Sequence, residues 1–329
     1  MMNRYLVAVV LMTFVLVGCQ PTESEVAYGD IADPFIGGNI GLNMYLQDGA
    51  PPPQIYDGGK FPFVFNTVIE NVGEADIGPT TENPYVSARI EGINPATFGV
   101  TQANLHQSLQ EPIRGARKNF DGTIIGGMIA NFVFENLNYQ GKLQGNDLIT
   151  LRGQVCYDYN NVATSQLCFK NDIIENVEDI SLCTLTGEKI VHNSGGPIHV
   201  TSIIQNPLGS NKVQANFIIE HVGPGEFYGR QPDEDCDPNI RNTNKHKVEV
   251  DVWVEDPNAY VQCFRLDNSN HGTITLYNGI PQTVTCTITG GAPEARVYTD
   301  ILTVKTSYRY GQFIEQPIVI QALPQDFDG

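Results

Sequence analysis

The chain lacks most of the short motifs that mark a catalytic or metal centre. Its seven cysteines form no CxxC or CxxH pair and its six histidines form no HxxxH or HxH pair, so the usual zinc ligands are missing. No GxSxG turn is present to carry a serine nucleophile. These absences predict a protein that is not an enzyme, although paired carboxylates from distant strands would leave no trace in the spacing.

Basic residues and tryptophan are also scarce. The 329 residues include 19 lysines and arginines against 37 aspartates and glutamates, which gives a net charge of −18. Such an acidic chain repels nucleic acid, so we expect no nucleic-acid partner. The single tryptophan, Trp253, leaves few of the aromatic platforms on which sugars usually bind.

The apolar run at the N-terminus is too short to cross a membrane. Residues 5–18 are uncharged, and these 14 residues fall below the roughly 20 that a spanning helix needs. A short apolar run after a single basic residue, Arg4, has the layout of a signal peptide. We therefore predict a signal peptide over residues 1–18.

The run ends in Leu16-Val17-Gly18-Cys19, which resembles a prokaryotic lipobox. The resemblance implies that Cys19 carries a lipid and that the polar, acidic residues 19–31 form a tether. We expect an exported protein, lipid-anchored at the cell surface or an envelope membrane, with that membrane as a partner through Cys19. An ordinary signal peptide with a chance cysteine at its cleavage site is the alternative.

Six cysteines remain when Cys19 is set aside, and an even number in an oxidising compartment indicates disulfides. The pairs we favour among 15 connectivities are Cys156–Cys168, Cys263–Cys286 and Cys183–Cys236. The first rests on a hairpin that sets Val155 opposite Phe169 and Tyr157 opposite Leu167, so that four apolar side chains share one face. Free buried thiols are the alternative.

The body of the chain alternates apolar and polar residues in short runs, punctuated by 32 glycines and 20 prolines. Val, Ile, Thr and Tyr fill these runs, and no long stripe of helical period is present. The pattern predicts an all-β fold of the sandwich type.

An internal repeat divides this body. NTVIENVG at 66–73 recurs as NFIIEHVG at 216–223, and LRGQVCYDY at 151–159 recurs as LTVKTSYRY at 302–310. The offsets are 150 and 151, and near-equal offsets at both ends of a unit indicate a duplication. The predicted units are a first domain at 32–176, a linker at 177–189 and a second domain at 190–326, each domain closing with its Tyr-x-Tyr strand and a hairpin partner.

The segment ENVGEAD at 70–76 resembles the early strand of CARDB-like and related immunoglobulin-like modules of prokaryotic surface proteins. FPFVF at 61–65, placed between DGG at 57–59 and that segment, looks like archaeal surface proteins, a family without an established activity. The strand count and this resemblance imply two tandem immunoglobulin-like β-sandwich domains. Neither resemblance brings catalytic residues.

Two loops and one set of tyrosines are candidate sites. An acidic loop offers oxygen ligands to calcium, the one cofactor considered, although it lacks the usual order of a calcium loop and a solvated charged loop is the alternative. Its residues are Asp233, Glu234, Asp235 and Asp237. The proline-rich segment 49–53 is a candidate recognition loop or, alternatively, a stiff connection.

The tyrosines of the two Tyr-x-Tyr motifs recur at matched positions, which favours core or tyrosine-corner roles over a binding stripe. They are Tyr157, Tyr159, Tyr308 and Tyr310. His221 is matched by Asn71 in the first repeat, which favours a turn role over a ligand role.

These features predict a non-enzymatic, lipid-anchored cell-surface protein with a structural, adhesion or envelope-interaction role. Its expected partner is an envelope or extracellular protein or a glycan. A carbohydrate- or solute-binding accessory lipoprotein is the first alternative, and an extracellular hydrolase is the second.

Overall fold

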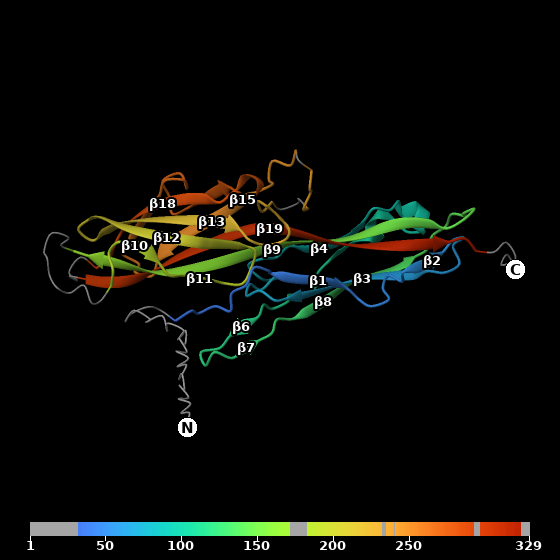
Figure 1. Cartoon of the computed structure of the whole chain (residues 1–329), viewed down its shortest axis with the longest axis horizontal. Coiled ribbons are helices and arrows are strands. Elements are labelled where there is room, and N and C mark those ends of the chain that lie inside the picture. The colour runs from blue at the N-terminus through green and yellow to red at the C-terminus, as the bar shows by residue number, and fades with distance from the viewer. Residues whose placement is uncertain (1–31, 172–182, 232–234, 240, 293–296, 324–329) are drawn as a thin grey trace, which may run out of the picture.

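The computed structural model describes residues 32–171, 183–231, 235–239, 241–292 and 297–323 (Figure 1). The described chain is built almost entirely of strands, with three short 3-10 turns at Pro95–Phe98, Gln102–Leu105 and Tyr277–Gly279. The all-β prediction is confirmed. No helix in these ranges has the length and apolar character needed to cross a membrane. The predicted signal peptide, Cys19 and the tether lie outside the described residues.

Two long strands organise the molecule. β9 (Asp147–Lys170) and β19 (Val297–Gln321) pair antiparallel along their whole length, from Val297 opposite Lys170 to Ile320 opposite Asp147. At about 3.3 Å per residue, this ribbon is roughly 80 Å long. Figure 1 shows it running through the long axis of the molecule, with sheets on both halves.

The first half places a three-stranded sheet against one end of the ribbon. The strands of that sheet are β1 (Leu42–Leu46), β3 (Phe63–Asn71) and β8 (Ile129–Leu137). The ribbon is widened here by β4 (Val86–Glu91), β5 (His106–Ser108) and β2 (Gln54–Tyr56). A separate hairpin of β6 (Arg117–Lys118) and β7 (Ile124–Ile125) precedes β8.

The second half places a five-stranded sheet against the other end of the ribbon. Its strands are β10 (Gly187–Lys189), β12 (Ile198–Gly209), β13 (Lys212–His221), β18 (Gln282–Thr289) and β16 (Tyr260–Cys263). The ribbon is widened here by β11 (Val191–Asn193), β15 (Lys247–Val254) and β17 (His271–Thr275), and near its middle by β14 (Glu226–Tyr228).

The hairpin predicted to close each repeat is wrong. β9 runs on without a turn, so that its first part pairs with β4 in the first half and its last part pairs with β11 in the second. β19 returns the other way and ends beside β2. Residues 162–170, placed by the sequence in the first domain, therefore complete the second half, while the end of β19 completes the first.

The disulfide prediction fails for the same reason. Cys156 and Cys168 lie twelve residues apart on one extended strand, roughly 40 Å, which no disulfide can span. Cys156 instead bonds to Cys236, and Cys168 bonds to Cys183, so the predicted Cys183–Cys236 pair is also wrong.

The prediction of Cys263–Cys286 is confirmed, because these residues face each other on β16 and β18. All six cysteines after Cys19 are thus paired, which suggests an oxidising, extracellular environment.

The repeated tyrosines meet where the ribbon passes from one half to the other, a region we call the waist. Tyr157 lies opposite Tyr310, Tyr159 lies opposite Tyr308, and all four side chains are fully buried. Their rings contact one another at centroid distances of 5.8 to 6.3 Å. The predicted core role of these residues is confirmed.

The same tyrosines explain the repeated Val-Gly. The hydroxyl of Tyr310 accepts a hydrogen bond from the backbone of Gly225 at 2.6 Å, and that of Tyr159 accepts one from Ala75 at 3.4 Å. A Cβ atom on Gly73 would lie 1.9 Å from the Tyr159 oxygen, and one on Gly223 would lie 2.5 Å from the Tyr310 oxygen. Each repeat therefore needs glycine where its own tyrosine hydroxyl reaches the turn.

We predict that Gly73→Ala lowers the free energy of unfolding by about 1–3 kcal/mol or more, because the added methyl group overlaps the Tyr159 hydroxyl and the carbonyl oxygen of Gly195. Gly145→Ala is the matched control, since a Cβ there meets nothing within 4 Å. Urea unfolding measures both variants. Equal losses in the two would contradict the packing explanation.

Candidate functional site

The face of the waist opposite the tyrosines carries a buried ion pair. Asp158 and Arg309, the middle residues of the two Tyr-x-Tyr motifs, face each other across the ribbon with 2.9 Å between Oδ1 and Nε. Their side chains are only 6% and 4% exposed. The guanidinium carbon of Arg309 lies 3.8 Å from the ring centre of Tyr85, so the ion pair is also covered by an aromatic face.

Residues 235–239, which we call the strap, cross this face and are fastened to it. The disulfide from Cys236 to Cys156 bonds the strap to β9. Arg89 of β4 donates to the Asp235 carboxylate at 2.7 Å, and the hydroxyls of Tyr85 and Ser87 donate to it at 3.2 Å each. The acidic loop of the second repeat is thereby fixed to strands of the first half.

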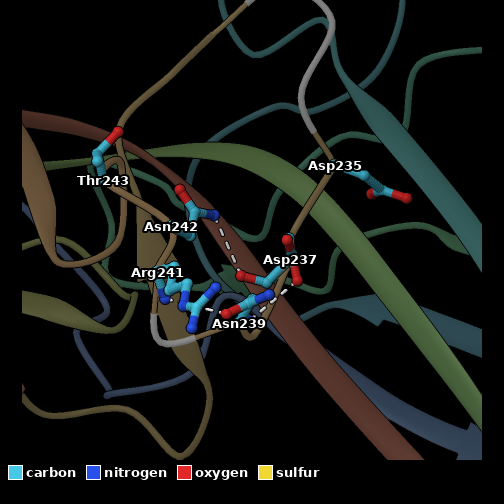
Figure 2. Close-up of a pocket in the computed structure, with 6 residues that line it drawn as sticks. All are labelled: Asp235, Asp237, Asn239, Arg241, Asn242 and Thr243. Carbon is cyan, nitrogen blue, oxygen red and sulfur yellow. Dashed lines mark hydrogen bonds between the residues drawn. The ribbon is translucent and has the colours of Figure 1, made fainter.

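In the described part of this loop, the carboxylates of Asp235 and Asp237 bind different partners. Figure 2 shows the Asp235 side chain pointing away from Asp237 and Asn239, toward the partners on β4. Asp237 uses Oδ1 to accept the backbone N–H of Asn239 at 2.9 Å, beside Arg241 in the same open hollow. Asp233 and Glu234 lie outside the described residues. Elsewhere in the described ranges, no three histidine, cysteine, aspartate or glutamate side chains gather closely enough to hold a metal ion.

A second hollow gathers titratable residues at the edge of the second half. Lys245 Nζ lies 2.7 Å from Glu226 Oε2, and His246 Nε2 lies 3.8 Å from the same oxygen. Burial lowers the pKa of His221 and of His246, which favours the neutral form of both imidazoles. The described residues lining this hollow include no serine, threonine or cysteine that a histidine could activate.

His221 is engaged by the fold. Its Nε2 lies 3.0 Å from the hydroxyl of Tyr310, and its ring packs 4.8 Å from that of Phe227. Asn71, the matching residue of the first repeat, donates across the Val-Gly turn to the carbonyl of Ala75 at 2.9 Å. Both residues hold the chain at the end of the repeated strand, as the matched positions predict.

The proline-rich segment 49–53 connects β1 to β2 and is held at both ends. The carbonyl of Ala50 accepts the N–H of Asn66 at 3.0 Å, and that of Pro53 accepts the N–H of Val319 at 3.0 Å. Pro51 is buried. These bonds favour the stiff connection over the recognition loop.

Asp57 fastens the end of the ribbon beside this connection. Its buried carboxylate accepts the backbone N–H groups of Leu143 at 2.7 Å and of Leu323 at 2.8 Å. Because these donors favour the charged form, they lower the pKa of Asp57 below 3.8.

Sequence reasoning missed the β6–β7 hairpin, an exposed element that carries large apolar side chains. Residues 117–126 are all exposed, and Phe120 at the tip is completely so. The signal was present in Asn119-Phe120-Asp121-Gly122, a turn sequence that places an aromatic residue between polar ones.

No protein-family model matches the chain, and no curated protein matches it.

We predict that Asp158→Ala lowers the free energy of unfolding by about 3–5 kcal/mol, because it removes the buried carboxylate that pairs with the Arg309 guanidinium. The matched control is Glu315→Ala, which breaks the exposed Arg152–Glu315 pair on the same two strands and should cost about 0–1 kcal/mol. Urea unfolding at neutral pH compares them. Similar losses of unfolding free energy in the two variants would show that burial does not strengthen the contribution of the Asp158–Arg309 pair.

We also predict that Asp57 contributes to the acid sensitivity of the fold. Its folded-state pKa is lowered, so its stabilisation is present above the unfolded value of 3.8 and is lost as the pH falls through the folded pKa. Asp57→Asn should therefore lower the thermal midpoint at neutral pH and flatten the loss of stability below pH 3.8. Glu135→Gln, an exposed change in the same half, should leave the curve unchanged. An Asp57→Asn curve parallel to that of the unmodified protein would contradict the assignment.

Proposed function

We propose that this protein is a non-enzymatic, lipid-anchored cell-surface protein that acts as a rigid spacer in a structural, adhesion or envelope-interaction role. The observation that carries the proposal is the unbroken β9–β19 ribbon, which is shared by both halves of the molecule. The lipid is attached to Cys19, and the partner is an envelope or extracellular protein or a glycan.

The ribbon supports a spacer because it couples the two halves. Domains in tandem on a peptide linker move relative to each other by default. Here bending between the halves would break backbone pairs near Tyr159 and Tyr308, and it would also break the contacts of the strap. Arg230, from the second repeat, adds a bond to the carbonyl of Tyr159 at 2.9 Å. A rod of this length presents its far end at a fixed distance and angle.

The proposal also takes each half as an immunoglobulin-like sandwich with one exchanged strand. Each half has two packed sheets, and each contains the repeated strand, the Val-Gly turn and a tyrosine whose hydroxyl binds that turn. This last contact is similar to a tyrosine corner, a feature of such sandwiches. The end of β9 lies in the second half and the end of β19 lies in the first, so each half gains one strand segment for the one it gives.

A non-enzymatic role is supported by the way the charged groups are used. The carboxylates of Asp158, Asp235 and Asp57 accept hydrogen bonds from donors on other strands or loops, and these bonds hold the elements together. Groups bound in this way stabilise the scaffold and are not poised for proton transfer.

We predict that Cys19→Ala abolishes incorporation of a labelled fatty acid or isoprenoid and releases the protein from the membrane fraction of the producing cells. The thiol is the only attachment point that the lipobox offers, so no other residue should take its place. Thr22→Ala, a change in the predicted tether, is the control and should retain both lipid and membrane association. Membrane retention of the Cys19→Ala protein without label would contradict the anchor.

The non-enzymatic part is tested separately with the chain from Gln20 onward. Binding to envelope proteins or to glycans without turnover supports the spacer. Hydrolysis of a glycan or peptide substrate, abolished by a point change in this chain, would contradict it.

A further inference from the structure

The β6–β7 hairpin, residues 117–126, projects from the body of the first half. Figure 1 shows it leaving the sheets below β1 and β8, on the side where the first described residues run. Its two strands pair only with each other. The hairpin therefore presents its side chains to the surroundings and not to the core.

These side chains are unusually apolar for an exposed element. Phe120 is completely exposed at the tip, and Ile124 and Ile125 are 60% and 56% exposed. Met128 and Ile129, where the hairpin joins β8, are also exposed. Single apolar residues on a surface are ordinary, but five large ones within ten residues mark a contact surface.

The turn holds Phe120 in this exposed position. The N–H of Asn119 donates to the carbonyl of Thr123 at 2.8 Å, and the N–H of Gly122 donates to that of Asn119 at 2.9 Å. Gly122 has a φ of 83°, which glycine adopts without strain. Asp121, the one acid of the tip, accepts the backbone N–H and the hydroxyl of Thr123 at 3.0 and 2.7 Å, so its charge is satisfied within the turn.

The charge of the hairpin differs from that of the chain. The hairpin and its base carry Arg114, Arg117 and Lys118 and one acid, Asp121, in a protein with a net charge of −18; Arg117 is paired with Asp76 at 2.8 Å. Such an apolar tip suits the boundary between lipid headgroups and acyl chains, where the apolar groups insert, and the exposed Arg114 at its base can meet a lipid phosphate.

The position of the hairpin relative to the N-terminus points to the same surface. Lys118 Nζ donates to the carbonyls of Asp33 and Phe35 at 2.9 and 3.1 Å, which places the start of the described chain against the hairpin. The carboxylate of Glu74 holds the next residues through the N–H groups of Ile36 and Gly37. Residues 19–31 reach at most about 45 Å when fully extended, so a lipid on Cys19 would lie within reach of this side of the molecule.

We propose that the β6–β7 hairpin is a second membrane contact, which inserts Phe120, Ile124 and Ile125 into the surface of a lipid bilayer. A stable protein interface buries about 800 Å² on each partner, which is more than the tip of a hairpin with strands of two residues offers. Insertion into a bilayer needs only the apolar side chains themselves. The identity of the membrane rests on the proposed anchor, but the affinity for lipid does not.

The test uses the chain from Gln20 onward, which lacks Cys19 and contains every described residue, with vesicles of phosphatidylcholine. We expect measurable sedimentation of the unmodified chain with the vesicles. Phe120→Asp should lower the partition coefficient at least about tenfold, because it removes the phenyl group that would be buried in the bilayer. Phe264→Asp, the same change at an exposed position of the second half, is the matched control and should stay within about twofold of the unmodified chain. Equal effects of the two variants, or no binding by the unmodified chain, would overturn the proposal.

A spectroscopic measurement locates the inserted residue. With Trp253→Phe as background, Phe120→Trp should shift its emission to the blue when vesicles are added, whereas Phe264→Trp should not. Loss of a protein partner by Phe120→Asp, with no vesicle binding by the unmodified chain, would assign the hairpin to a protein and also overturn the proposal. The vesicle experiments use a chain without Cys19, so their results do not depend on the labelling of Cys19. The two experiments therefore test the lipid anchor and the hairpin independently.

Discussion

The rest of the structure depends on the antiparallel pairing of β9 with β19. The two strands occupy matching positions in the repeat, and each crosses from the half it begins in to the other. The ribbon therefore supplies a central pair of strands to both sheets at once, and it forces the two Tyr-x-Tyr motifs to meet at the waist. The tyrosine cluster, the buried ion pair and the seat of the strap all lie at this crossing.

Pairing of equivalent strands also explains how the two repeats have diverged. At the centre of the waist, Asp158 faces Arg309, the residue at its own position in the second repeat. Identical charges would repel each other in a buried site, whereas opposite charges bind, so this position is compatible only with unlike residues or neutral ones. The residue opposite Cys156 is Gly311, where a Cβ would lie 3.1 Å from the Cys236 sulfur. The glycine makes room for the disulfide that joins the loop of the second repeat to β9.

The sequence was sufficient to predict the all-β fold, the buried tyrosines and the local disulfide between Cys263 and Cys286. It could not distinguish a hairpin after Tyr159 from a continuous strand, because both place the odd-numbered residues from Leu151 to Phe169 on the core face. The two wrong disulfides followed from that ambiguity. The strap was recognisable as acidic, but Arg89 lies 146 residues earlier in the chain, and nothing local indicates their contact.

Because the ribbon joins the two halves, the proposed membrane contacts would orient the whole described molecule. A lipid on a tether fixes the height of a protein above a bilayer only loosely, because the tether can point in any direction. A second contact through Phe120 would fix the orientation of the first half. Since the strands of that half continue without interruption into the second, the orientation would be transmitted to the far end by backbone hydrogen bonds and by the strap. Two separate domains joined by a linker would not transmit this orientation, because they could rotate about the linker. This is a physical reason for exchanged strands in a surface spacer.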